Sequence, residues 1–137
     1  MSTRKIAVLM TCFNRKNTTL SCLENLFKNT IPNKYQLKVF LVDDGSSDGT
    51  SEAISSKYPK VSIINGDGDL FWNRGMHLSW EKAKTEGFDF YLWLNDDTCL
   101  FENAISILLH SAELMDNHSI IVGASCSQKT SKLTYSG

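Results

Sequence analysis

Hydrophobic and polar residues follow one another along the chain in blocks that predict strands and helices in turn. Short apolar runs with the length of buried strands occupy residues 6–10, 37–42, 61–64 and 88–94. Between and after these runs, apolar residues recur at helical spacing, and the predicted helices begin near Asn17, Asp48, Asn73 and Glu102. One more short apolar run, at residues 120–122, predicts a final strand.

The predicted helices each have one apolar face. In the first helix this face includes Leu23 and Phe27, and in the third it includes Met76, Trp80 and Ala83. Alternation of strands with amphipathic helices predicts an α/β fold, in which a mostly parallel, Rossmann-like sheet is covered by helices on both faces. A length of 137 residues without an internal linker predicts a single domain, residues 1–137.

Composition narrows the class of protein. The hydrophobic share of 42% and the charged share of 21% are ordinary for a globular domain, and a net charge of -1 gives no reason to expect nucleic acid as a partner. No run approaches the roughly 20 apolar residues that cross a bilayer. The apolar start of the chain is interrupted by Thr11 and Asn14, which favours a first strand over a signal peptide. The cysteines lack C-x-x-C spacing and are expected to be reduced thiols, which predicts a cytoplasmic protein.

Two pairs of adjacent carboxylates follow predicted strands. Asp43 and Asp44 come directly after residues 37–42, and Asp96 and Asp97 come after residues 88–94. Adjacent carboxylates repel each other unless something positive neutralises them. Mg²⁺ and Mn²⁺ prefer carboxylate and phosphate oxygens, and one or two protein carboxylates are often enough. Because ligands bind beyond the carboxyl ends of parallel strands, these pairs predict a metal-assisted phosphate or nucleotide site, with Asp97 as the candidate metal ligand.

A purely structural interpretation is the alternative. Asp, Gly and Ser are the expected residues of a strand-to-helix turn, and Asp48 is a good helix cap. That interpretation accounts for residues 45–50 but not for two carboxylates in sequence. A carboxylate at Asp43 or Asp44 can instead accept hydrogen bonds from a base N–H or a ribose hydroxyl.

Two further loops carry weaker signals. After the first strand, Phe13 can serve as a stacking platform for a base and Thr11 as a hydrogen-bond partner. Near the third helix, Trp72 is either a core residue or an aromatic wall of the pocket, and Arg74 meets either a diphosphate or solvent. The glycines of residues 66–70 do not form a dinucleotide fingerprint, because Phe71 occupies the last glycine position.

Taken in order, these segments resemble the family 2 glycosyltransferases of the GT-A fold. No single piece is specific, but the ordered set is, and it covers essentially the whole chain. The matching segments are residues 11–15, 42–50, 73–75 and 94–98. The acidic motif of this family is often written D-x-D, and here Asn95 stands at its first position.

The resemblance implies a role for each matching residue. Thr11 and Asp44 would contact the base, with Phe13 where the family often has a stacking tyrosine. Asp96 would lie near the ribose, and Asp97 would coordinate Mg²⁺ or Mn²⁺ bridging the diphosphate. The nucleotide-binding set predicted in this way is Thr11, Phe13, Asp43, Asp44, Asn73, Arg74 and Asp96.

The resemblance also implies an activity: transfer of a sugar, with inversion, from a nucleoside-diphosphate sugar to an acceptor hydroxyl. A UDP- or dTDP-sugar is the expected donor, and a carbohydrate or lipid-linked glycan, as in polysaccharide biosynthesis, is the expected acceptor. The catalytic module of this family is normally much longer, so the chain is expected to be its N-terminal, donor-binding part, with the general base beyond Gly137. The expected location is cytoplasmic, with a peripheral place at the inner membrane face as an alternative.

Two other classes of protein compete with this interpretation. A nucleotidyltransferase also uses an acidic edge of an α/β fold, but it usually has a glycine-rich, basic loop after the first strand, which residues 11–15 lack. A receiver-like signalling domain should have its acidic pair at the end of the first strand, where this chain has Thr11 and Cys12. Both are therefore less favoured.

Overall fold

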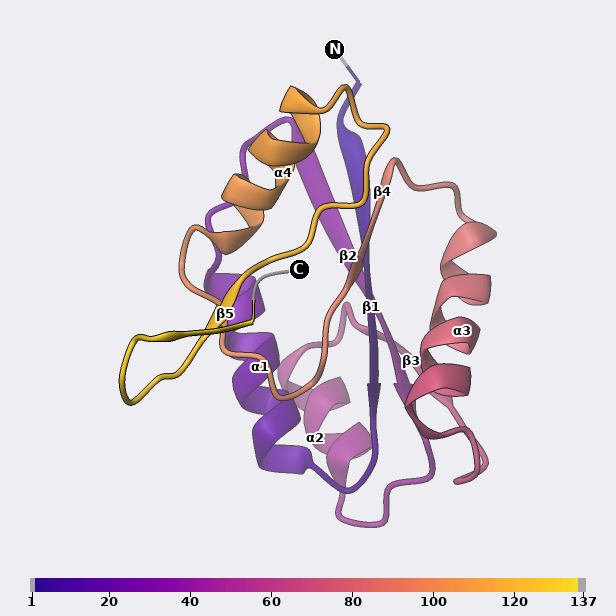
Figure 1. Cartoon of the computed structure of the whole chain (residues 1–137). Coiled ribbons are helices and arrows are strands. Elements are labelled where there is room, and N and C mark those ends of the chain that lie inside the picture. The colour runs from indigo at the N-terminus through magenta and orange to yellow at the C-terminus, as the bar shows by residue number, and fades with distance from the viewer. Residues whose placement is uncertain (1, 136–137) are drawn as a thin grey trace.

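The central element of the fold is a parallel sheet of four strands in the order β3-β2-β1-β4 (Figure 1). The structure is a computed structural model that describes residues 2–135. The register pairs Cys12 with Asp43 and Asp43 with Asn65, so the carboxyl ends of three strands are level. The strands are β1 (Arg4–Cys12), β2 (Tyr35–Asp43), β3 (Ser62–Asn65) and β4 (Phe90–Trp93).

Helices cover both faces of this sheet, as Figure 1 shows. Helix α3 (Phe71–Lys84) packs on one face against β1 and β2. The other face is covered by α1 (Lys16–Lys28), α2 (Thr50–Lys57) and α4 (Ala104–Leu114). The predicted α/β fold, with a parallel sheet between helices, is therefore confirmed.

Strand β1 supplies the centre of both layers of the core. Its residues alternate between the two faces because successive side chains of a strand point in opposite directions. Val8 and Met10 join the apolar cluster with α1, α2 and α4, whereas Ala7 and Leu9 pack with Met76 of α3. The side chains of these four residues of β1 are fully buried. Helices thus pack against both faces of β1, and this packing fixes the position at which the following loop begins.

The order of strands creates a switch point between β1 and β4. The chain passes from β1 to β2 through α1 on one face, and from β3 to β4 through α3 on the opposite face. The strand order therefore reverses where β1 and β4 lie side by side. In open α/β sheets ligands bind beyond the carboxyl ends of the strands, near the point where the strand order reverses.

The prediction of a final strand at residues 120–122 is wrong. These residues form no strand, and Ile120 is 93% exposed. A strand is held by hydrogen bonds to a partner, and this run of three apolar residues pairs with no other strand in the described chain. The last regular structure is instead a short antiparallel pair, β5 (Ser125–Cys126) and β6 (Leu133–Tyr135).

Two residues predicted to face the core lie at its margin. Phe27 of α1 is 42% exposed and stacks on Tyr58, and Trp80 of α3 is 36% exposed.

Within residues 2–135, no helix has the length and apolar character that crossing a bilayer requires.

Helix α3 approaches β1 most closely at Gly75. A Cβ atom built on Gly75 would lie 2.4 Å from Thr11 Oγ1 and 3.0 Å from Thr11 Cβ. Gly75 is buried, so neither the helix nor the strand can move aside without disturbing the core.

We expect Gly75→Ala to lower the free energy of unfolding by about 1–3 kcal/mol through overpacking, although alanine is the better helix former. Urea denaturation measures this change. The double variant Gly75→Ala, Thr11→Ala should lose less than the sum of the two single variants, because they share one contact. Additive losses would show that the contact does not limit the packing.

Candidate functional site

The candidate site is the edge of the sheet at which all four strands end, the lower edge in Figure 1. Four loops meet there because the strands are parallel: residues 13–15, 44–49, 66–70 and 94–103. Side chains from one loop repeatedly bond to the backbone of another. We call this edge, with its four loops, the rim.

Asp44 fixes the third of these loops. Its carboxylate accepts hydrogen bonds from the backbone N–H groups of Gly68 at 2.9 Å, Leu70 at 3.0 Å and Phe71 at 2.9 Å. Phe71 is the first residue of α3, so the negative charge also lies at the N-terminus of that helix, where it is favourable. Asp44 is buried, and its partners are protein groups 24 to 27 residues further along the chain.

Asp43 has a similar structural role in its own turn. Its Oδ1 atom accepts the backbone N–H of Ser46 at 2.9 Å, and its Oδ2 atom accepts the hydroxyl of Ser51 in the first turn of α2. Asp43 is buried as well. The sequence predicted that both carboxylates of this pair bind the nucleotide, and the structure shows that each already holds a loop in place.

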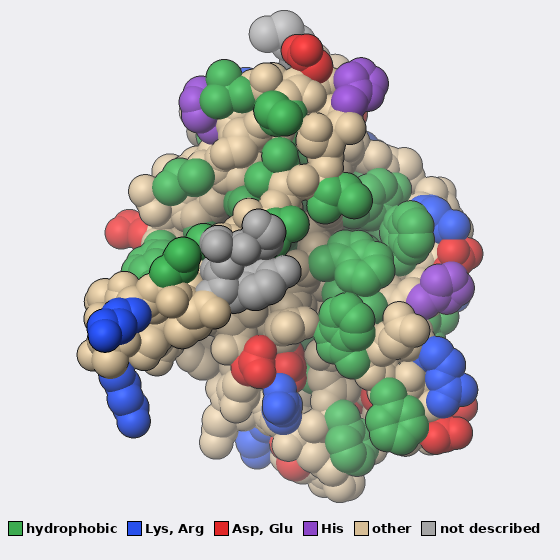
Figure 2. Space-filling view, in the orientation of Figure 1, with side chains coloured by type: hydrophobic (Ala, Val, Ile, Leu, Met, Phe, Trp, Pro, Cys, Tyr) green, Lys and Arg blue, Asp and Glu red, His purple; other side chains and the backbone are tan. Residues whose placement is uncertain are grey.

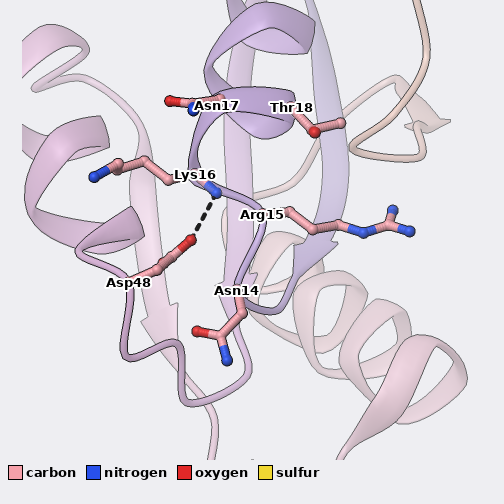
Figure 3. A pocket seen from close by; sticks show the side chains of 6 residues that line it. All are labelled: Asn14, Arg15, Lys16, Asn17, Thr18 and Asp48. Carbon is pink, nitrogen blue, oxygen red and sulfur yellow. Dashed lines mark hydrogen bonds between the residues drawn. The ribbon is translucent and has the colours of Figure 1, made fainter.

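Asp48 joins the N-termini of two helices. Its Oδ1 atom accepts the N–H of Thr50, the first residue of α2, at 3.1 Å, although Gly49 rather than Asp48 is at the N-cap position. Its Oδ2 atom accepts the N–H of Lys16 at 2.9 Å (Figure 3). Hydrogen bonds from Thr50, above all, and from Lys16 lower the pKa of Asp48. Helix α1 begins at Lys16, one residue before the predicted start at Asn17, and the N–H of Lys16 is bonded from another loop.

The loops after β1 and β2 are further connected through Asn14. Its backbone N–H donates to Ser46 Oγ at 2.8 Å, and its side-chain oxygen accepts the N–H of Ser47 at 2.7 Å. Asn14 adopts a positive φ of 49°, which asparagine tolerates better than most residues. Beside it lies a polar cavity of about 390 Å³, whose lining is drawn in Figure 3: Asn14, Arg15, Lys16, Asn17, Thr18 and Asp48.

The second acidic pair is contacted by an arginine that the sequence analysis did not select, and this arginine offsets one of the two negative charges. Arg15 Nη1 lies 3.0 Å from Asp96 Oδ1 and 3.4 Å from Asp97 Oδ2. Asp96 also accepts a hydrogen bond from Thr19 Oγ1 at 3.2 Å. Burial raises the pKa of Asp96, and the hydrogen bond from Arg15 opposes this shift. The two aspartates differ sharply in exposure, 8% for the side chain of Asp96 and 54% for that of Asp97.

The acidic loop is also connected to α3. Trp72 Nε1 donates a hydrogen bond to Asn95 Oδ1 at 2.8 Å, and the Trp72 ring packs edge-on against Trp93 at 6.1 Å between centroids. Trp72 is 51% exposed, so of the two alternatives left open by the sequence the core residue is wrong, and the aromatic wall of the pocket stays a prediction. Hydrophobic side chains gather over α3 and β4 in Figure 2; the exposed large ones of these elements are Phe71, Trp72, Trp80, Tyr91 and Trp93.

The remaining predicted residues lie at different depths. Phe13 is 53% exposed at the end of β1, whereas Thr11 is buried beneath Gly75. Asn73 and Arg74 are exposed in the first turn of α3, and Arg74 bonds to the backbone oxygen of Asp69. The structure therefore gathers all the predicted residues around the rim, but leaves only part of them accessible to a ligand.

The donor set determines which kind of cation site these residues can form. Within the described residues, no group of three or more His, Cys, Asp or Glu side chains could hold a metal ion. Asp97 is half exposed beside the buried Asp96. A hard cation such as Mg²⁺ is often held by one or two carboxylates together with substrate phosphates. The residues present thus fit a cation that is shared with a ligand, rather than one enclosed by protein alone.

Comparison with known proteins agrees with this arrangement. The family model described as Glycosyl transferase family 2 matches residues 7–135. A cholesterol galactosyltransferase of Borreliella burgdorferi is 27% identical over 129 residues, which is 90% of this chain and 32% of the relative. The chain thus spans about a third of the length of the curated relative that it matches.

Solved structures of GT-A glycosyltransferases share the fold. S. aureus TarS 1-349 in complex with UDP superposes with a TM-score of 0.66 at 20% identity, over 83% of this chain and 32% of that one. The mannosyltransferase PcManGT from Pyrobaculum calidifontis, in complex with GDP-Man and Mn²⁺, gives a TM-score of 0.61 at 18% identity, over 93% of this chain and 36% of that one. At these identities the likeness concerns the fold.

The contacts of Asp44 lead to a prediction about the rim. We expect Asp44→Asn to lower the free energy of unfolding by about 2–4 kcal/mol, because an amide cannot accept all of these N–H groups and brings its own donors toward them. Chemical denaturation with urea measures the loss. Asp67→Asn, in the same loop, is the matched control: the exposed Asp67 accepts the N–H of Asp69, and the substitution should cost under about 1 kcal/mol. Equal losses would contradict the role given to Asp44.

Proposed function

Because the chain belongs to glycosyl transferase family 2, we propose that it is the donor-binding part of an enzyme that transfers a sugar from a nucleoside-diphosphate sugar to an acceptor hydroxyl. The observation that carries this proposal is the half-exposed Asp97 at the switch point between β1 and β4. It lies on the rim, where the buried carboxylates of Asp43 and Asp44 fix neighbouring loops by hydrogen bonds. Catalytic and binding residues work best on such a scaffold, because their positions are set before the ligand arrives.

The nucleotide has a proposed place between the loops after β1 and β3. Phe13 is exposed there and supplies an aromatic face on which a base can stack. Thr11, Asp43 and Asp44 form the floor, and the two aspartates fix the loops on which the nucleotide rests. Asn73 and Arg74 flank the base from α3, and Asp96 lies toward the ribose. A UDP- or dTDP-sugar is the proposed donor, and the UDP complex of TarS supports a uridine nucleotide.

The proposed chemistry is a single displacement with inversion. The acceptor hydroxyl attacks the anomeric carbon and gives its proton to a general base, the bond to the diphosphate breaks, and the nucleoside diphosphate leaves with the electron pair. A Mg²⁺ or Mn²⁺ ion on Asp97 would stabilise the charge that grows on the diphosphate. The Mn²⁺ in the PcManGT complex supports a metal-assisted reaction. The contribution of this chain is to bind and orient the donor, so that its anomeric carbon faces the acceptor.

A cytoplasmic location is also proposed. All four cysteines are free thiols, and burial raises the pKa of both Cys12 and Cys22 to about 12, so these two thiols stay protonated. Unpaired cysteines support a reducing compartment. The acceptor is proposed to be a carbohydrate or a lipid-linked glycan, as in polysaccharide biosynthesis.

Calorimetric titration of the 137-residue chain with UDP, dTDP and GDP, with and without Mn²⁺, tests the proposal. We expect one nucleoside diphosphate to bind, and Mn²⁺ to tighten its binding about tenfold or more, because the cation joins the diphosphate to Asp97. Asp97→Asn should remove most of the Mn²⁺ dependence.

Glu102→Gln neutralises an exposed carboxylate five residues further on and serves as the control for charge alone. It should leave the Mn²⁺ dependence unchanged. Nucleotide binding that is independent of Mn²⁺ and indifferent to Asp97→Asn would refute the metal-assisted mechanism, and absence of any nucleotide binding would refute the proposed function.

A further inference from the structure

Arg15 occupies the place of a cation on the acidic pair. A single nitrogen, Nη1, lies between the two carboxylates, 3.0 Å from Asp96 Oδ1 and 3.4 Å from Asp97 Oδ2. The carboxylates come from the loop after β4 and Arg15 from the loop after β1, so the contact closes the switch point between adjacent strands. Its single positive charge offsets one of the two adjacent negative charges.

The two contacts of Arg15 differ in strength. Asp96 is buried and is also held by Thr19, and its ion pair with Arg15 is correspondingly fixed. The contact with Asp97 is longer and joins two half-exposed side chains, with 52% of Arg15 and 54% of Asp97 accessible. Exposed ion pairs contribute little to stability, so a stronger ligand can replace this one.

We propose that Arg15 is a built-in counter-cation, which competes with the divalent cation for Asp97 and is released toward the diphosphate when the donor binds. This inference rests on the proposed function, because it concerns the same site. A planar guanidinium bonds phosphate oxygens through paired N–H groups, so the donor offers Arg15 a better partner than Asp97 does.

The consequence is coupling between cation and donor. A cation that binds alone must displace Arg15 from Asp97, and Arg15 then gains no new partner besides Asp96. When the donor is bound, its diphosphate has already taken Arg15 from Asp97, so the cation binds Asp97 without this competition. Because binding linkage is reciprocal, the donor tightens the cation by the same factor as the cation tightens the donor.

The first experiment measures the affinity of the 137-residue chain for Mn²⁺ alone, from the electron paramagnetic resonance signal of free Mn²⁺. We expect Arg15→Gln to bind Mn²⁺ about three- to tenfold more tightly than the wild type, because the competing cation is gone. Arg15→Lys keeps the charge and should stay near the wild type. Circular dichroism spectra confirm that each variant is folded.

Lys16→Gln is the matched control. It removes the same charge from the next residue, but the side chains of Lys16 and Arg15 point in different directions in Figure 3, and only Arg15 contacts the acidic pair. Lys16→Gln should change the affinity for Mn²⁺ less than about twofold, as a charge separated by solvent does. An equal gain in Lys16→Gln and Arg15→Gln, or no gain in Arg15→Gln, would overturn the competition.

The second experiment repeats the Mn²⁺ titration in the presence of saturating UDP. We expect UDP to tighten Mn²⁺ by a larger factor in the wild type than in Arg15→Gln, which has lost both the competition and the contact with the diphosphate. Equal factors would overturn the release of Arg15 toward the donor. Failure of every variant to bind UDP would instead count against the proposed function, while the titrations with Mn²⁺ alone still decide the competition.

Discussion

Four strands of one sheet run parallel, so the negative charges that follow β2 and β4 have to be offset at a single edge. This constraint organises the rim. Asp43 and Asp44 end the central strand β2, and Asp96 and Asp97 follow β4 on the other side of β1. Buried carboxylates are costly unless they are hydrogen-bonded or paired. The loops that join strands to helices must therefore bring partners to this edge, and their conformations follow from that need.

The aspartates of the rim meet this need in different ways, and the differences separate structure from function. Backbone N–H groups surround Asp44, Asp43 has Ser46 and Ser51, and Asp48 lies at the starts of two helices. Each of these carboxylates is satisfied by groups that cannot leave without unfolding a loop. Asp97 differs from these three: it is half exposed, and its contact with Arg15 is one of side chains alone. The carboxylates that follow β2 and β4 thus include three that hold loops or partners in place and, in Asp97, one that remains available to a ligand.

The sequence predicts the frame of this site well because the frame depends on local patterns. The four strands of the sheet, the four helices and the acidic strand ends all follow from periodicity and turn residues. The contacts of the acids could not be predicted in the same way, since they join distant segments: Asp44 bonds to a loop 24 to 27 residues later, and Arg15 and Asp96 are 81 residues apart. Arg15 becomes a candidate only once β1 and β4 are known to be neighbours. The prediction of a strand at residues 120–122 was wrong for a similar reason, because a strand requires a partner strand, and the sequence of the run itself does not show whether one is present.

The hold of Arg15 on the acidic pair sets how the site can respond to a ligand. Had both aspartates been buried, breaking the ion pair would cost about 3–5 kcal/mol, and the pair would be a structural element like Asp44. Had both been exposed, the pair would contribute about 0–1 kcal/mol and would impose no order on the loops. The structure combines the two cases, with Asp96 buried and Asp97 half exposed. Asp96 keeps Arg15 in reach of the rim while Asp97 stays exchangeable, so the loops after β1 and β4 remain aligned until a diphosphate and its cation take over the charge.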